Sequence, residues 1–116
     1  MTTPALYNLS IWVGNSTTFT FRLKQDLTTP LDLTTSSMIM TIAHDGNLIE
    51  LNATSGNVEI TDAVNGEFTV TMTALETRAI KSSSASVTYE IERRVGSEQT
   101  TVLYGSIALT GGANVD

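Results

Sequence analysis

The chain has 116 residues, a formal net charge of −6 and no cysteine. A chain of this length is expected to form one domain, residues 1–116, with enough buried surface for a hydrophobic core. The acidic balance disfavours nucleic acid and anionic membrane surfaces as partners. The absence of cysteine excludes disulfides and sites built on a thiolate.

Neither end of the chain carries a segment that predicts secretion or membrane insertion. The first ten residues lack a basic segment followed by an apolar one, so we expect no signal peptide and synthesis in a cytoplasm. No apolar run approaches the ~20 residues that a membrane-spanning helix needs. Residues 1–5 are expected to form a flexible arm, because Pro4 limits regular pairing, and residues 111–116 a flexible tail.

Alternating apolar residues predict β-strands along most of the chain. After a first alternating segment around Leu9 and Ile11, the clearest strand is Thr18 to Lys24. There Phe19, Phe21 and Leu23 share one face. Further strands are predicted at 37–44, 47–51, 58–60, 68–72, 87–94 and 100–110, and turn signals separate them at Asp45-Gly46, Asn65-Gly66 and Gly96-Ser97.

The last predicted strand does not keep one alternation. Its apolar residues are Val102, Leu103, Tyr104, Ile107 and Leu109, which fall on both parities. A β-bulge switches the face of a strand, and glycine often marks one. We therefore expect a bulge at or near Gly105.

A short helix is predicted inside this β pattern. Thr73 and Glu76 have the T-x-x-E spacing of a capping box, in which each side chain accepts a hydrogen bond from the backbone of the other. The residues that follow suit a helix at about Ala74–Ile80, with Leu75, Ala79 and Ile80 facing inward. The fold class is thus an all-β, antiparallel, immunoglobulin-like β-sandwich of eight or nine short strands, with one short helix between two late strands.

The residue types that carry chemistry are few and have structural explanations. His44 is the only histidine, and it stands at a strand end beside a turn with no nucleophile paired to it. The acidic segments 45–47 and 62–67 lack the ligand spacing of an EF-hand. Asp26, Asp32, Glu50 and Glu59 cannot be paired from sequence into a glycosidase site. We therefore expect no catalytic residue, no metal and no cofactor.

Two aromatic residues near the N-terminus have a functional alternative. Tyr7 and Trp12 could stack on sugar rings, as the aromatic residues of carbohydrate-binding modules do. Packing in the core or at its rim is the simpler interpretation. The carbohydrate-binding hypothesis is kept as the alternative to the function below.

Three groups of residues occur in an order that resembles a known family. The first is the G-x-[ST]-x-x-F-x-F-x-L pattern at Gly14 to Leu23, followed by Pro30 to Thr34. The second is the strand-to-helix join at Gly66 to Thr77. The third is Tyr89 to Glu92 with Leu103 to Leu109. This order resembles the small β-sandwich domains of tailed-bacteriophage virions, in particular the N-terminal domain of phage baseplate upper proteins and related short tail proteins. Members usually have glycine before the tyrosine strand, where this chain has Ser82 to Ser86.

The resemblance implies a structural role without catalysis. It implies a virion component that packs on the tail or baseplate, or on the capsid as a decoration (cement) protein. The expected partners are other virion proteins, and the chain is expected in several copies or as a homo-oligomer. Because the sequence stops at Asp116, we expect only the module that attaches to the virion.

Overall fold

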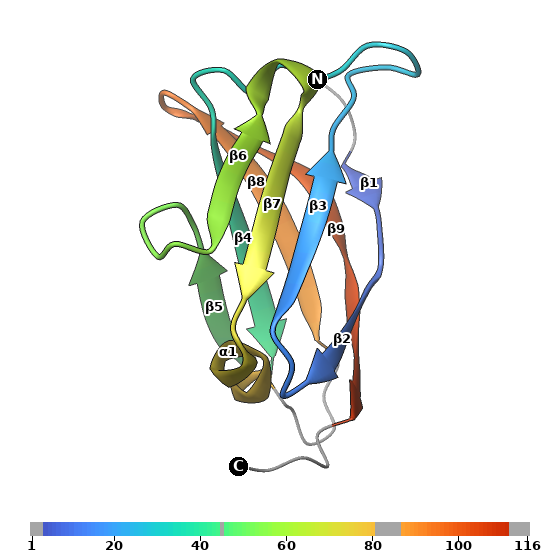
Figure 1. Cartoon of the computed structure of the whole chain (residues 1–116). Helices are drawn as coiled ribbons and strands as arrows, with labels where there is room; N and C mark the ends of the chain where they lie inside the picture. Colours follow the sequence, from blue (N-terminus) through green and yellow to red (C-terminus); the bar gives the residue numbers. More distant parts are fainter. Residues whose placement is uncertain (1–3, 45, 81–86, 112–116) are drawn as a thin grey trace.

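The computed structural model describes residues 4–44, 46–80 and 87–111. Within them the chain forms strands in two layers, one α-helix at one end and a 3-10 turn at the other (Figure 1). The elements are β1 (Ala5–Leu6), β2 (Leu9–Val13), β3 (Thr17–Arg22), β4 (Ser37–His44), β5 (Asn47–Leu51), β6 (Val58–Asp62), η1 (Ala63–Asn65), β7 (Glu67–Met72), α1 (Ala74–Ala79), β8 (Thr88–Val95) and β9 (Glu98–Gly111).

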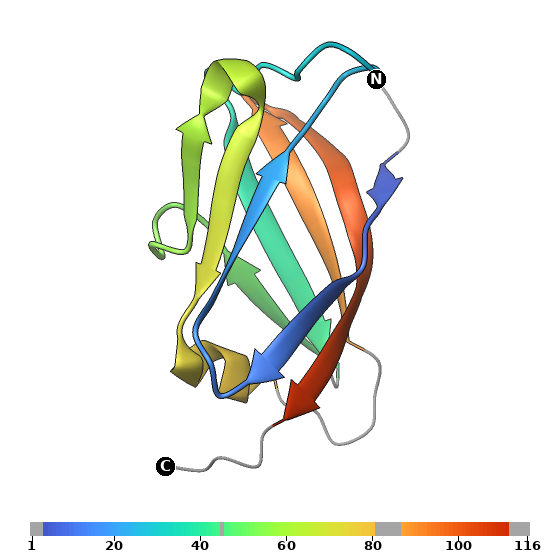
Figure 2. The ribbon, with the colours of Figure 1, turned by 45° about the vertical axis from the view of Figure 1, so that its right-hand side comes forward.

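The two layers have the strand order of an immunoglobulin-like sandwich. The larger sheet runs β1-β9-β8-β4-β5, with β2 also on β9, and the smaller sheet runs β3-β7-β6. In the immunoglobulin fold, one sheet contains strands G, F and C and the other contains strands B, E and D. Here β9, β8 and β4 take the places of G, F and C, and β3, β7 and β6 take those of B, E and D. Figure 2 shows the two layers from the side. The all-β sandwich expected from the sequence is confirmed, although β1 and β2 run parallel to β9.

The core lies between the sheets and follows the predicted alternation. In the smaller sheet Phe21 pairs directly with Phe68, and their rings stack with centroids 5.1 Å apart. Across the gap, β4 contributes Met38, Met40 and Ile42, all buried as their shared parity predicts. Leu33, from the connection between β3 and β4, is also buried, so this connection closes one end of the core.

The N-terminal segment is more ordered than the arm that we expected. Ala5 already pairs with Leu103, so the arm prediction is wrong there; residues 1–3 lie outside the described residues. β1 and β2 continue one register along β9 and are interrupted only at Tyr7 and Asn8. At the other end, Gly111 belongs to β9, and the rest of the predicted tail lies outside the described residues.

The bulge in β9 lies earlier than predicted. Ile91 pairs with Leu103 and Glu92 with Thr101, so Val102 is the extra residue and both Val102 and Leu103 are buried. Gly105 has another role: a Cβ there would lie 2.2 Å from the carbonyl oxygen of Tyr7. The glycine leaves room for the N-terminal segment to cross β9.

The helix turns a different side inward than its apolar pattern indicates. Ile80 is buried, as predicted, but Leu75 is 74% exposed and Ala79 is exposed as well. The fully buried residue of α1 is Thr77. Its hydrogen bonds to the turn before β3 fix this orientation, as described below. No helix in the described ranges is both long and apolar enough to cross a membrane.

Candidate functional site

The predicted helix cap is the centre of a polar cluster at one end of the sandwich. Both hydrogen bonds of the capping box are present: the Glu76 amide donates to Thr73 Oγ1 at 3.1 Å, and the Thr73 amide donates to Glu76 Oε1 at 2.8 Å. Asn57 Nδ2 lies 3.0 Å from each oxygen of the Glu76 carboxylate. The Thr73 amide, first, and then Asn57 hold the pKa of Glu76 below its usual range. Glu76 is therefore an ionised structural acceptor.

Thr77 joins the same helix to the turn between β2 and β3. Its hydroxyl accepts a hydrogen bond from the Gly14 amide at 3.0 Å and lies 3.0 Å from the carbonyl oxygens of Asn15 and Ala74. These contacts satisfy backbone groups beside a fully buried side chain. No local sequence signal marks this role of Thr77, because Gly14 and Asn15 are more than 60 positions away.

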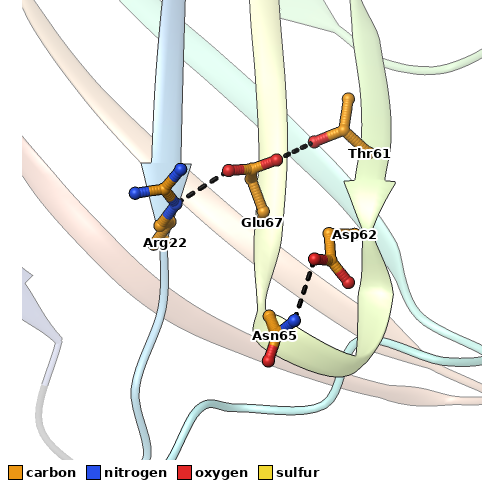
Figure 3. A network of polar contacts seen from close by, with 5 residues as sticks. All are labelled: Arg22, Thr61, Asp62, Asn65 and Glu67. Carbon is orange, nitrogen blue, oxygen red and sulfur yellow. Dashed lines mark hydrogen bonds and ion pairs between the residues drawn. The ribbon is translucent and has the colours of Figure 1, made fainter.

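A second polar network crosses the outer face of the smaller sheet (Figure 3). Glu67 on β7 accepts hydrogen bonds from Arg22 Nε on β3 at 2.7 Å and from the Thr61 hydroxyl on β6 at 2.9 Å. Nearby, Asn65 donates to Asp62 at 2.9 Å. The Arg22 hydrogen bond, followed by that of Thr61, lowers the pKa of Glu67. This network links all three strands, and its exposure limits its stabilising effect.

The other carboxylates that the sequence analysis considered lie apart from one another. Asp26 accepts hydrogen bonds from the amides of Thr28 and Thr29, and Asp32 accepts them from Thr34. These turn hydrogen bonds lower the pKa of both aspartates. Glu50 lies on β5 and accepts from Asn52, whereas Glu59 lies on β6. The structure does not bring these carboxylates together into an acid–base pair.

The two adjacent arginines of β8 and the single histidine also have structural positions. Arg93 donates to the Ser36 hydroxyl at 2.9 Å and to the Asp32 carbonyl at 3.1 Å, so it fastens the connection before β4. Arg94 is paired with Glu92 at 2.6 Å. His44 ends β4 and is half-buried, and its neighbour Asp45 lies outside the described residues. Over the described ranges, no three His, Asp or Glu side chains gather as a metal site would require.

Tyr7 and Trp12 are both exposed but do not form one platform. Tyr7 is 56% exposed, and its ring meets Phe21 edge-on at the seam between the sheets, with centroids 6.4 Å apart. Trp12 is 53% exposed and covers Gly111 on β9. The two residues are five positions apart along an extended segment, which spans about 16 Å. Each ring could contact a ligand separately.

Comparison with known proteins adds no family to these observations. The chain matches no protein-family model and no curated protein sequence. Most of the hydrogen-bonded carboxylates described above serve a cap, a turn or a cross-strand network.

Proposed function

We propose that the chain is a non-enzymatic structural component of a bacteriophage virion. It assembles through protein–protein contacts on the tail or baseplate, or on the capsid as a decoration protein. The observation that carries this proposal is the order of the three residue groups that resemble virion sandwich domains. They correspond to β3, the β7–α1 join and the β8–β9 pair.

The surface supports a role in assembly. Leu6 and Tyr104 are neighbours in the β1–β9 register, and both are exposed. Leu6 and Tyr104 thus form an exposed apolar pair on the outer face of the larger sheet, and the exposed ring of Tyr7 lies beside them at the seam with the smaller sheet. Exposed apolar side chains that gather in this way mark surfaces that contact other proteins. Other virion proteins are the proposed partners.

Fractionation of phage particles tests this role. In a density gradient of a lysate of the encoding phage, the chain should sediment with infectivity and remain with the particles after a high-salt wash. A chain found only in the soluble fractions would contradict the proposal. A soluble phage protein of similar size, expressed late in infection, is the control for trapping of free protein.

The exposure of Trp12 favours carbohydrate binding as the second candidate function. The indole is accessible on the outer side of β2, and aromatic faces stack on sugar rings. A glycan array probed with the wild-type chain should then show binding that Trp12→Ala abolishes and that Leu27→Ala, a distant exposed position, leaves intact. A wild-type chain silent on the array would eliminate this candidate.

A further inference from the structure

The free edge of β5 has few of the features that usually prevent strands from pairing between molecules, and its one charged residue is Glu50. In the larger sheet β5 pairs with β4 alone and ends the sheet (Figure 1). Its sequence, Asn47–Leu51, contains no proline and no lysine, and its register with β4 has no bulge. Proteins normally protect an edge by such features. By contrast, the edge strand β6 of the smaller sheet has a register shift at Thr61.

The register with β4 determines which backbone groups of β5 face outward. His44 and Asn47 close a two-residue connection and form a hydrogen-bonded pair. Hydrogen-bonded pairs recur at every second residue, so Ile49 and Leu51 also direct their backbone groups to β4. The amides and carbonyls of Leu48 and Glu50 therefore point to the free edge. Leu48 is also 73% exposed. The edge thus offers hydrogen-bonding groups together with an apolar side chain.

We propose that β5 is a homodimer interface, where it pairs antiparallel with β5 of a second copy about a twofold axis at Ile49. In this register Leu48 of each copy exchanges two hydrogen bonds with Glu50 of the other copy, so the outward groups match. Ile49 meets Ile49 in a non-bonded pair, where side chains come closest. A shift of two residues pairs only three residues of each β5. In one direction it places Glu50 opposite Glu50, which like charges disfavour, and in the other it places Leu48 opposite Leu48.

The choice of a second copy rests on this self-complementarity. The same strand supplies both sides of the pairing, and no charged residue lies opposite a residue of the same charge. The net charge of −6 on each copy opposes association at low ionic strength. The dimer should therefore strengthen as salt is added. The inference concerns the purified chain and holds whether or not the chain belongs to a virion.

The absence of native cysteine allows a test that depends on the register. In the proposed dimer the two Ile49 Cα atoms lie about 4.5 Å apart, within the range that a disulfide spans. Purified Ile49→Cys should therefore oxidise to a covalent dimer. Leu48→Cys is more exposed, but its two copies lie diagonally at about 7–8 Å and should cross-link more slowly. Equal or faster cross-linking of Leu48→Cys would indicate random collision or a register with Leu48 opposite Leu48, and either would overturn the proposal.

Light scattering of the uncross-linked chain completes the test. The wild type should show a dimer whose fraction rises with protein and salt concentration. Leu48→Glu should weaken that dimer roughly tenfold or more, because it places a carboxylate opposite Glu50 of the other copy. The matched control Leu27→Glu makes the same change at an exposed leucine away from the edge and should have little effect. A wild type that remains monomeric throughout, or a dimer indifferent to Leu48→Glu, would reject the β5 interface.

Discussion

Tyr89 donates its phenolic hydrogen bond to the backbone carbonyl of Tyr7, 82 positions earlier in the chain. The ring of Tyr89 is buried. Its partner on β9 is Gly105, and the absence of a side chain there leaves space for the Tyr7 carbonyl to approach. Asn8 completes the crossing by accepting hydrogen bonds from the amide and hydroxyl of Ser106. Side chains thus attach the N-terminal segment to β8 through Tyr89 and to β9 through Ser106, at the point where the pairing of β1 and β2 with β9 is interrupted.

Removing the Tyr89 hydroxyl should loosen this attachment. Tyr89→Phe leaves the Tyr7 carbonyl without its donor, and the loss of one such part-buried hydrogen bond costs about 1 kcal/mol. Urea unfolding should report this loss in the free energy of unfolding. Tyr104→Phe, which removes an exposed hydroxyl, should change stability by less than about 0.5 kcal/mol. Equal effects of the two substitutions would contradict the role of the Tyr89–Tyr7 bond.

The same tyrosine predicts a loss of stability at alkaline pH. Burial, first, and then the nearby Tyr7 raise the pKa of Tyr89 to about 12. In the unfolded chain the phenol loses its proton near pH 10, so the unfolded state binds fewer protons than the folded state above that pH. The contribution is therefore intact below about pH 10 and is lost as pH rises towards about 12. The pH dependence of unfolding in this window should be shallower in Tyr89→Phe than in the wild type.

The stacked pair at the centre of the smaller sheet predicts two large and similar losses. Phe21 and Phe68 are buried and in direct contact. Replacing either by alanine should cost about 3–5 kcal/mol. Phe19 lies on the same face of β3 but is only partly buried, so Phe19→Ala should cost less. A melting temperature unchanged by Phe21→Ala or Phe68→Ala would contradict the assigned face of β3 and β7.

Removing the helix cap should cause a modest loss of stability, and the contribution of the cap should depend on pH in the acidic range. Thr73→Ala should cost about 1 kcal/mol, as the loss of an N-cap usually does. Because the folded state depresses the pKa of Glu76, its contribution is present above the ordinary glutamate value of about 4.3 and is lost as pH falls through the lower folded value. Glu76→Gln should therefore reduce the steepness of acid destabilisation. Glu98→Gln, at an exposed strand end, is the control.

Local patterns explain what could be predicted from the sequence. The capping box depends on two residues three positions apart, and the Phe21–Phe68 face depends on a period of two, so both can be recognised without tertiary information. The inward side of the helix could not be predicted, because the contacts of Thr77 with Gly14 and Asn15 decide it. The role of Gly105 was likewise hidden, since a glycine in a strand indicates either a bulge or a close backbone approach.

The candidate site shows the same division. The sequence indicated that Thr73 and Glu76 form a cap, but Asn57 joins this cluster only through the fold. The attachment of β1 and β2 to β9 depends on contacts about 98 positions apart, for which no local signal exists. Tyr7 and Trp12 have no partner close by in the sequence, so the sequence alone fits both packing at the core and stacking on a sugar ring.

The most direct test of the virion role is the copy number of the chain in purified particles. Quantitative mass spectrometry of gradient-purified virions should detect the chain in a fixed ratio to the major capsid protein. A ratio near that of the capsid protein would indicate a decoration protein, and a much lower fixed ratio would indicate the tail or baseplate. Absence of the chain from infectious particles, or an amount that varies between preparations, would contradict the proposed role.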